Sequence, residues 1–503
     1  MSLTIYRAAL SSTHSLGHAN DGATEYSAFR YAGHRDKPGQ IPGKCGFAKE
    51  RGRRLDHRMP ASQRVKLPAA LAVVVGTMIG TGVYGSLGYQ VAAVPSAFPV
   101  LLLWVLGGVL AAFGAVNYAE LTAALPRSGG EYHLLGRVYH PAVGFLSGWT
   151  SLTVGFPAPI AVSAVFFANY MAGATGWLWF GSAQATFYVL ASGIIVIITA
   201  LHLISVQASG MSQTVLTMLK VMLVAGLAVS GFFVDDPASI SFLPQRGDGA
   251  LMAQPAFSIS LIFVLYAYSG WNAACYIAGE VEDPSRTLPR ALIGGTALVT
   301  LLYVALNAAF LHSTPIPALA GQADVGFVAA QHIFGDHGAR LIAGLIAAGL
   351  VSSISGLLWA GPRVAQAMGQ DHELLAPLAL TTARGVPWVA TLFHGGFALV
   401  LLFAANVPQI LTATEFSLQL ILVLTVYGVV HLRLKEPALL RPYRAWGYPW
   451  TTFLFLAAMI YVLAYILQNR HRESLWGLGN SFAAFCVYSL AATWQARRRG
   501  ANR

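Results

Sequence analysis

The residues from Val73 to Tyr84 place three glycines and two threonines in the middle of an apolar segment that extends from about 67 to 94. Each glycine inside a helix costs about 1 kcal/mol relative to alanine, so an unbroken helix is unfavourable here. In a bilayer, a broken helix persists only where protein or a watery cavity satisfies the freed N–H and C=O groups. The stretch therefore predicts either an interrupted helix that holds a ligand or a glycine-rich face packed against another helix.

A second interruption lies in the apolar segment from 257 to 281, where Tyr266-Ala-Tyr-Ser-Gly-Trp-Asn272 falls at mid-depth. Two broken helices expose N–H groups and a positive dipole end that suit a carboxylate, and free carbonyls that suit an ammonium. These are the charged groups of a free amino acid, and no side-chain charge lies in either break. We therefore predict a zwitterion site in which Gly80-Thr81-Gly82 faces the carboxylate.

The side chains beside the two breaks each have more than one interpretation. The Thr81 hydroxyl either assists carboxylate binding or bonds back to its own helix. Tyr266, Tyr268 and Trp271 either line or gate the site or are ordinary packing residues, and the position beside Ser269-Gly270 favours a role at the site for Tyr266 and Trp271. Asn272 lies just beyond the second break, where its amide can face the substrate side chain.

The apolar segment from 209 to 233 carries a lysine, Lys220, about twelve residues from its start. A buried ammonium costs several kcal/mol on insertion scales and needs partners or a proton-transfer role. Snorkelling to a membrane surface is the alternative, but either surface is roughly 15 Å away at the rise of an α-helix. We therefore predict a coupling role for Lys220.

The composition indicates a multi-span membrane protein. Of the 503 residues, 56% are apolar and only 10% are charged, against about 25% charged in soluble proteins. The net charge of +11 comes largely from regions outside the apolar runs, with twelve of the 31 Lys and Arg residues before the first run. That distribution indicates membrane orientation and argues against a nucleic-acid partner. The cysteines show no metal-like spacing, so we expect no metal site, no cofactor and no disulfide framework at Cys45, Cys275 and Cys486.

Twelve apolar runs predict twelve transmembrane helices. Their expected bounds are 67–94, 97–125, 141–172, 183–205, 209–233, 254–281, 287–312, 338–368, 387–407, 410–432, 450–468 and 476–495. With the N-terminus inside, the inner loops and the C-terminal tail hold fourteen Lys and Arg residues and the outer loops hold four. Both termini are therefore expected in the cytoplasm, with the protein in the cell (inner, cytoplasmic) membrane.

The two interrupted spans are the first and the sixth, five spans apart. An odd number of spans reverses the direction of entry, which is typical of an inverted repeat with a substrate site near the midplane. We therefore predict an all-α membrane fold, with a transporter domain over 66–496 that contains repeats at 67–233 and 254–432 and two extra helices at 450–495. Residues 1–65 are expected to be a disordered cytoplasmic extension, for which Met59 offers an alternative start, and 497–503 a basic cytoplasmic tail.

Acidic residues concentrate near the expected span ends. Glu120 and Glu131 flank the stretch 125–130, and a charged inner end to the sixth span is formed by Glu280, Glu282 and Asp283 with Arg286 and Arg290. Most of these residues are expected to form interfacial salt bridges that set closure on the cytoplasmic side. Glu415 lies near the outer end of the tenth span and is expected to be structural.

Several motifs in order resemble the amino acid–polyamine–organocation (APC) superfamily, specifically its L-type and bacterial amino acid permease branches. The first break contains Gly76-Thr-Met-Ile-Gly-Thr-Gly-Val83, and the second is followed by Gly279-Glu-Val-Glu-Asp-Pro284. Leu125-Pro-Arg-Ser-Gly-Gly-Glu-Tyr132 resembles the family's first inner loop, and Arg441-Pro-Tyr-Arg-Ala-Trp-Gly-Tyr-Pro449 the loop before the eleventh span. The resemblance covers residues from about 67 to 491.

The resemblance implies a five-plus-five inverted repeat (the LeuT-like fold) and secondary transport of amino acids, expected to be neutral ones, by alternating access. It implies that Thr81 and Gly82 hold the substrate carboxylate and that Tyr266 gates the site. It also implies that the amine is held by carbonyls near Met78, Ile79, Tyr266 and Ser269. With Gly80, Gly270 and Asn272, these residues form the predicted substrate site.

Lys220 resembles a lysine that takes the place of a sodium ion in some family members, which implies sodium-independent transport by proton coupling or exchange. Thr81 and Tyr84 depart from the family's usual Ser and Phe, which leaves the substrate's identity open. L-type relatives bond a single-span partner through an outer cysteine near the third and fourth spans. This chain has no Cys there, so we expect no disulfide-linked partner subunit.

We expect the amino acid transporter to interact with its substrate, protons and membrane lipid. Two other functions are alternatives to amino acid transport. A carrier of polyamines or organic cations would need acidic groups in the pocket, and none is expected at mid-depth. An amino-acid sensor without flux would suit the long N-terminal segment. No nucleophile–base pair or metal cluster appears in the spans, so we expect no enzyme and no catalytic residues.

Overall fold

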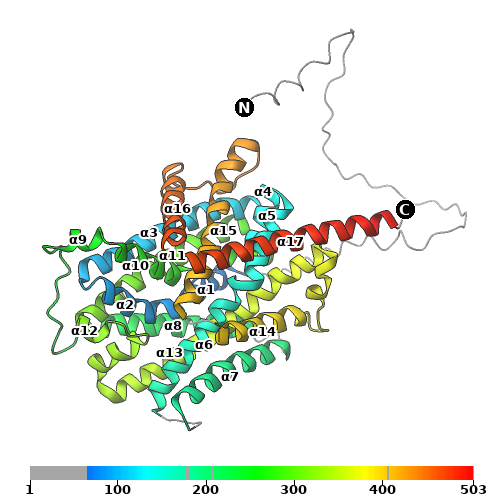
Figure 1. Ribbon diagram of the computed structural model, residues 1–503. Coiled ribbons are helices and arrows are strands. Elements are labelled where there is room, and N and C mark those ends of the chain that lie inside the picture. The colour runs from blue at the N-terminus through cyan, green and yellow to red at the C-terminus, as the bar shows by residue number, and fades with distance from the viewer. Residues whose placement is uncertain (1–64, 177–180, 205–208, 405–406, 502–503) are drawn as a thin grey trace, which may run out of the picture. The chain divides into compact units, whose positions relative to one another are not determined.

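The computed structural model describes residues 65–176, 181–204, 209–404 and 407–501 (Figure 1). The expected N-terminal extension therefore lies outside the described residues, apart from Val65. Every regular element in the described ranges is a helix, and an isolated parallel bridge joins Val65 to Val281. The all-α expectation is confirmed for this part of the chain.

The first half of the described chain begins with two short helices on either side of a break. Its elements are α1 (Leu67–Met78), α2 (Thr81–Ala93), α3 (Ala97–Ala124), α4 (Gly130–Val138), α5 (Pro141–Thr150), the π-helical turn η2 (Ser151–Gly155), α6 (Pro157–Thr175), α7 (Ala183–Ile204) and α8 (Ser209–Ser230).

The second half begins with another pair of short elements around a break. Its elements are α9 (Asp248–Met252), α10 (Pro255–Tyr268), the 3₁₀ helix η3 (Ala273–Glu280), α11 (Pro284–Ser313), α12 (Ile316–Leu319), α13 (Val325–Asp371), the 3₁₀ helix η4 (Glu373–Ala379), α14 (Trp388–Ala404), α15 (Val407–Lys435), α16 (Trp450–Asn469) and α17 (His471–Ala501).

Ten segments of the described chain are long and apolar enough to cross a membrane. Two of them contain the predicted breaks: Leu67–Ala93 holds α1 and α2, and Pro255–Glu280 holds α10 and η3. Two shorter apolar helices, Thr214–Ser230 and Trp388–Ala404, fall where the sequence predicts the fifth and ninth spans. The chain is therefore a multi-pass membrane protein.

Two helices differ from the expected spans. Helix α13 runs for 47 residues, whereas the sequence predicts a span only over 338–368. Gly335 interrupts it with φ 68° and ψ −177°, a conformation that glycine adopts because it has no Cβ. The residues before Gly335 therefore form a separate arm ahead of the span. Helix α4 occupies the region between 125 and 141 where an inner loop was expected.

The interrupted helices lie among longer ones (Figure 1). Helix α1 packs against α8 and α11, α2 packs against α10, and α13 packs along α6. The approach of α2 to α10 depends on Gly82, because a Cβ there would lie 2.4 Å from the Cα of Ala267. The glycine-rich packing face and the interrupted helix were alternatives from sequence, and both occur in the same stretch.

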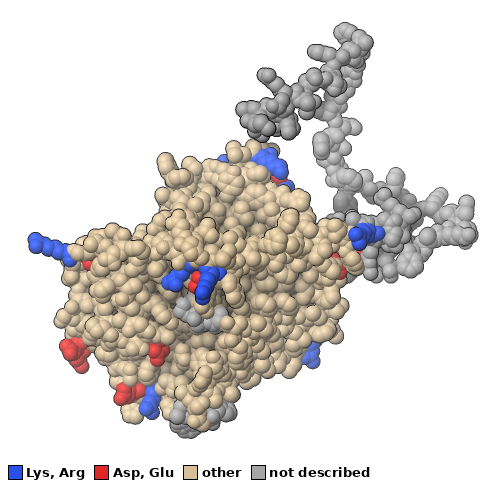
Figure 2. Space-filling model, in the orientation of Figure 1, with Lys and Arg blue, Asp and Glu red and all other residues tan. Residues whose placement is uncertain are grey.

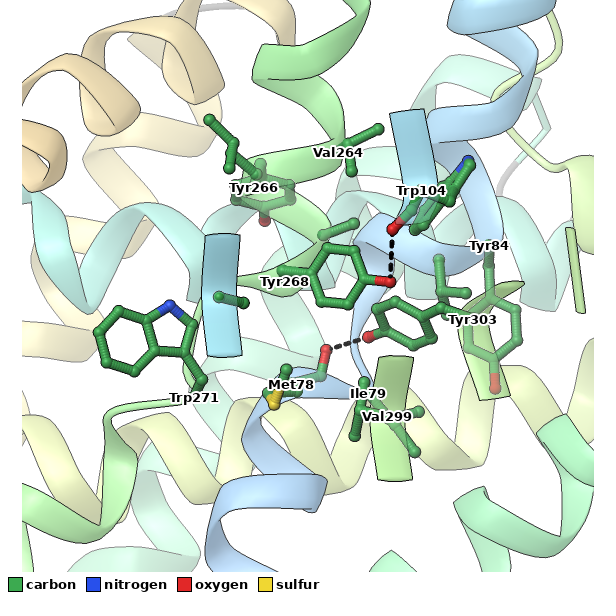
Figure 3. Packing of buried hydrophobic residues seen from close by; sticks show 14 of the residues in the cluster. Met78, Ile79, Tyr84, Trp104, Val264, Tyr266, Tyr268, Trp271, Val299 and Tyr303 are labelled. Carbon is green, nitrogen blue, oxygen red and sulfur yellow. Dashed lines mark hydrogen bonds between the residues drawn. The ribbon is translucent and has the colours of Figure 1, made fainter. Parts of the chain in front are cut away.

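A buried aromatic cluster holds the two breaks in place (Figure 3). Trp104 of α3 meets Tyr303 of α11 with ring centroids 5.6 Å apart, and Tyr268 of α10 meets Tyr303 at 5.1 Å. The Tyr268 hydroxyl donates to the Trp104 carbonyl at 2.9 Å, and the Tyr303 hydroxyl donates to the Met78 carbonyl at 2.5 Å. Aromatic pairs add about 0.5–1.5 kcal/mol beyond their buried area, so this cluster fixes the ends of α1 and α10.

The outer surface carries few charged side chains on the face drawn in Figure 2. Large apolar side chains are exposed instead, among them Ile197 of α7, Phe403 of α14 and Phe485 of α17. Such a surface fits contact with lipid hydrocarbon.

Candidate functional site: a cavity between two broken helices

The first break separates α1 from α2 at Ile79 and Gly80. Their backbones leave the helical region, with φ −72° and ψ 90° at Ile79 and φ −135° and ψ −148° at Gly80. The interrupted helix is therefore confirmed. Because α2 starts at Thr81, its first N–H groups have no acceptors within the helix. These groups and the positive end of the helix dipole suit an anion such as a carboxylate.

The second break separates α10 from η3 at residues 269 to 272. Gly270 has φ 98°, and a Cβ on it would lie 2.8 Å from Cγ2 of Thr77 in α1. Glycine is therefore required both for the backbone conformation and for the close approach of the two breaks. After the break the chain continues as a 3₁₀ helix, where the sequence predicts the remainder of an apolar span.

A cavity of about 120 Å³ lies between the two breaks. This is well above the roughly 10–15 Å³ that one water molecule needs, so the cavity can hold a small organic molecule. The other walls come from α4, α5, η2 and α6, from α13 and from α15. The lining is mostly apolar or hydroxyl-bearing, and beyond the breaks it includes Ser147, Ser151, Phe156, Ser163, Ser352, Ser353, Leu418 and Leu422.

Nearly all of the predicted site residues line this cavity. They are Met78, Gly80, Thr81, Gly82, Tyr266, Ser269, Gly270, Trp271 and Asn272. Ile79 and Lys220 do not line it: the side chain of Ile79 is buried, and Lys220 lies behind the first break. Tyr84 is also absent from the lining, and its ring meets that of Tyr170 edge-on at 6.4 Å.

A hydroxyl pair connects the two breaks across the cavity. The Thr81 hydroxyl lies 3.2 Å from the Tyr266 hydroxyl, so it bonds to the opposite helix and not back to its own. Trp271 packs edge-on against Tyr118 with ring centroids 4.8 Å apart. Tyr266 therefore contacts Thr81, which is predicted to bind the substrate carboxylate. Trp271 lines the cavity and also packs against α3.

The carbonyls at the end of α1 already have donors. Met78 accepts from Tyr303, and the Ile79 carbonyl accepts from Lys220 Nζ at 3.1 Å. A carbonyl oxygen has two lone pairs, so the cavity-lining Met78 can still accept from a substrate ammonium. Ile79 is the weaker candidate, because it lies outside the cavity lining.

Lys220 joins the first break to α13 through three hydrogen bonds. Its ammonium donates to the carbonyls of Gly76 and Ile79, each at 3.1 Å, and to the Ser353 hydroxyl at 2.8 Å. The residue is only 2% exposed, so the snorkelling alternative is wrong. No salt bridge pairs this ammonium with a carboxylate in the described ranges. Three oxygen acceptors alone therefore compensate its burial.

Glu131 is the acidic residue that the sequence reasoning misplaced. It was expected in an interfacial salt bridge, but it is 3% exposed, lines the cavity and accepts a hydrogen bond from the Asn272 amide. The sequence signal for the position of Glu131 was the pair of glycines before it. Gly129 and Gly130 both have positive φ and form the turn at the start of α4, the helix that carries Glu131. The expectation of a pocket without acidic groups is therefore wrong.

Ion pairs join helix ends away from the cavity. Glu120 accepts from Arg433 at 2.6 and 2.9 Å and lies 3.4 Å from Arg441, and Glu280 lies 3.5 Å from Arg363. Glu120 and Glu280 therefore form ion pairs, as expected, but Glu280 pairs with Arg363 of α13, and Arg286 pairs with Asp283. A further pair joins Arg137 to Glu436 at 2.8 Å, and that hydrogen bond lowers the pKa of the Glu436 carboxyl below its ordinary value.

Comparison with known proteins shows the family. A family model described as amino acid permease matches residues 65–492. The chain belongs to this family, and with it to the APC superfamily. It is 28% identical over 407 residues to the serine/threonine exchanger SteT of Bacillus subtilis (strain 168), covering 80% of this chain and 90% of the relative.

Two mammalian transporters are similar over most of their length. The b(0,+)-type amino acid transporter 1 of Mus musculus is 28% identical over 422 residues, covering 82% of this chain and 84% of the relative. The large neutral amino acids transporter small subunit 2 of Mus musculus is 26% identical over 449 residues, covering 88% and 83%. The resemblance drawn from the sequence motifs is confirmed, and amino acid transport is the function that the family and these relatives have in common.

Among the described residues, no group of three or more His, Cys, Asp or Glu side chains could hold a metal ion. The described cysteines, Cys275 and Cys486, are free thiols. The site of this permease is thus built from backbone groups, hydroxyls and aromatic rings, with Glu131 as its acidic side chain.

Proposed function

We propose that this permease is a secondary active transporter that carries neutral amino acids across the cell (inner, cytoplasmic) membrane by alternating access. The observation that carries the proposal is the cavity between the two breaks, with the N-terminus of α2 on one side and break carbonyls on the other. The N-terminus of α2, at Thr81 and Gly82, would bind the substrate α-carboxylate. The break carbonyls near Met78, Tyr266 and Ser269 would bind its α-ammonium.

The proposed topology has twelve spans with both termini in the cytoplasm. It takes α8 and α14 as the fifth and ninth spans, in addition to the ten longer segments. The inverted repeats would cover 67–233 and 254–432, followed by two helices at 450–495. Support comes from the two breaks, because each of them interrupts the first span of one proposed repeat.

Transport is proposed to be independent of sodium and to run by exchange or proton coupling. Lys220 supports this, because its ammonium already occupies a pocket of three oxygen acceptors that would suit a monovalent cation. The Bacillus subtilis relative is a serine/threonine exchanger, which favours exchange and small hydroxyl-bearing substrates here. No disulfide-linked subunit is proposed.

A second candidate function is the carriage of cationic amino acids or polyamines. Glu131 favours it, because its carboxyl lines the cavity beside Asn272 and could face a cationic side chain. A sensor that binds amino acids without moving them remains the alternative outside transport.

Purified protein in proteoliposomes tests these proposals. We expect labelled serine or threonine to exchange against the same internal amino acid, at equal rates in sodium and choline buffers. Competition by the twenty amino acids and by putrescine then ranks the substrates. Exclusive competition by cations would replace the neutral-substrate proposal, binding without flux would make the protein a sensor, and sodium-dependent flux would refute the role of Lys220.

A further inference from the structure

A buried acid–amide pair lies beside the substrate cavity in α15. Glu415 is 2% exposed, and its Oε2 accepts from the Gln419 amide at 3.0 Å, one helical turn away. The other carboxyl oxygen, Oε1, has no hydrogen-bond partner, and neither has Oε1 of Gln419. Two buried acceptor atoms therefore lack a donor in the same pair, although buried polar atoms are almost always hydrogen-bonded.

The surroundings of this pair are mostly apolar, with polar atoms from Tyr268, Ser269 and Trp271. A small cavity of about 30 Å³ adjoins it, lined by Leu110 and Ala111 of α3, by Phe455 and Met459 of α16, and by residues of α10. No salt bridge in the described ranges joins Glu415 to a cation. An ionised carboxylate in such a place costs several kcal/mol when no cation is paired with it.

A proton on Oε1 of Glu415 removes the unpaired charge and turns one of the two acceptors without a donor into a donor. When Oε1 of Glu415 carries a proton, the carboxyl gains a donor, and Oε1 of Gln419 is an acceptor on the same side of α15. The amide N–H already donates to the other carboxyl oxygen, so the neutral acid and the amide complement each other. The charged acid leaves Oε1 of Glu415 and Oε1 of Gln419 each without a donor, and its charge unpaired.

We propose that Glu415 is a proton-binding site of this permease, with Gln419 as its hydrogen-bond partner, and that its proton moves together with the substrate. The inference rests on the proposed transport function and adds the residue that binds the coupling ion. The sequence reasoning gave Glu415 a structural role, because its position in the span does not reveal the missing donor.

The pair communicates with the substrate cavity through shared walls. Ser269 and Trp271 of the second break and Leu418 and Leu422 of α15 line both cavities. A movement of the second break that admits water to the substrate cavity therefore also hydrates Glu415. Hydration removes the cost of the charged form, and the proton can leave to the open side. One proton then crosses the membrane with each substrate molecule.

Few ionisable groups face Glu415. Tyr268 of α10 lines the small cavity, and Tyr266 of the same helix lines the substrate cavity. The residues that α3 and α16 contribute there are apolar. Arg470 and Glu473 line a different cavity with Gln409 and Thr412, nearer the start of α15. Glu415 is therefore the acidic group of this region that can exchange a proton with the substrate cavity.

Infrared spectroscopy of Glu415→Gln tests the proton directly. The wild type at neutral pH should show the C=O stretch of a protonated carboxyl, and the variant should lose that part of the absorption. Glu282→Gln makes the same change at an exposed position and should leave the band unchanged. Gln419→Met, which removes the partner, should shift the frequency of the band and provides a second test should Glu415→Gln fold poorly. Spectra of Glu415→Gln and Gln419→Met that are identical to the wild type would overturn the proposal.

Transport measurements in the same proteoliposomes separate the two proposals. With one proton per substrate, a gradient of about one pH unit can drive about tenfold accumulation. Glu415→Gln should abolish that accumulation and keep amino acid exchange, whereas Glu282→Gln should keep both. Accumulation that survives in Glu415→Gln, or a wild type that exchanges without responding to the gradient, would overturn the role of Glu415. If the wild type shows no exchange at all, the proposed function is refuted. The infrared measurement tests the protonation of Glu415 independently of transport.

Discussion

Replacing Gly82 and Gly80 by alanine, one at a time, separates the packing role of the first break from its binding role. At Gly82 a new Cβ would lie 2.4 Å from Cα and 2.6 Å from Cβ of Ala267. At Gly80 the nearest atoms would be the Met78 carbonyl oxygen and the Ser353 hydroxyl, both at 3.9 Å. Both glycines line the substrate cavity, so the two variants differ mainly in what the methyl group meets.

The expected magnitudes follow from those distances. Real Cβ atoms do not approach another carbon at 2.4 Å, so Gly82→Ala must push α2 away from α10. Overpacking of this kind costs about 1–3 kcal/mol. Gly80→Ala meets only ordinary van der Waals distances, and Gly80 has an extended φ that any residue adopts. We expect its effect on the free energy of unfolding to stay within about 0.5 kcal/mol.

Equilibrium unfolding in bicelles measures the first effect, and serine binding to the purified protein measures the second. Gly82→Ala should lose both stability and binding. Gly80→Ala should keep its stability, while its methyl group, placed between Met78 and Ser353 at the edge of the cavity, weakens substrate binding severalfold. Equal stability of Gly82→Ala and wild type would refute the packing argument. Unchanged affinity in Gly80→Ala would remove the first break from the binding site.

Three further predictions concern side chains around the cavity. Lys220→Met leaves three acceptors without their donor, so we expect a loss of about 2–5 kcal/mol in the free energy of unfolding and a weaker pH dependence of uptake. Thr81→Val and Tyr266→Phe should each weaken binding, and a double-mutant cycle should give a coupling energy of about 0.5–1.5 kcal/mol. Glu131→Gln should reduce inhibition by lysine and putrescine and leave serine exchange within about twofold, since an amide keeps the shape of the group.

Each of these predictions has its own contrary outcome. A Lys220→Met protein as stable as the wild type would mean that the three acceptors find other donors. Additive effects of Thr81→Val and Tyr266→Phe would mean that the hydroxyl pair is not an interaction in solution. Inhibition by cations that is unchanged in Glu131→Gln would place the cationic side chain elsewhere in the cavity.

The two breaks could be predicted from the sequence because their signals are local. Glycines at 76, 80 and 82 and the Ser269-Gly270 pair disfavour a helix wherever the rest of the chain lies. The clustering of the predicted residues around one cavity followed from the spacing of the breaks, five spans apart. The mid-depth position of Lys220 was also readable, because helix rise alone places it far from either surface.

The features that escaped prediction depend on contacts between distant segments. Nothing near Glu131 in sequence reveals that Asn272, in another element, donates to it. Ile79 seemed equivalent to Met78, but the direction of its carbonyl toward Lys220 is set by how α8 packs on α1. The interruption of α13 at Gly335 was missed because a single glycine in a helical pattern is a weak signal.

The 3₁₀ form of η3 has a consequence for length. A 3₁₀ helix rises about 2.0 Å per residue and an α-helix about 1.5 Å. Residues Ala273–Glu280, eight in number, would therefore shorten by roughly 4 Å on conversion to an α-helix. One end of η3 carries the second break, and at the other end Glu280 is paired with Arg363 of α13. With that ion pair intact, conversion of η3 to an α-helix would pull the second break toward Glu280. The 3₁₀ form of η3 therefore allows the second break to move without any change in the neighbouring helices.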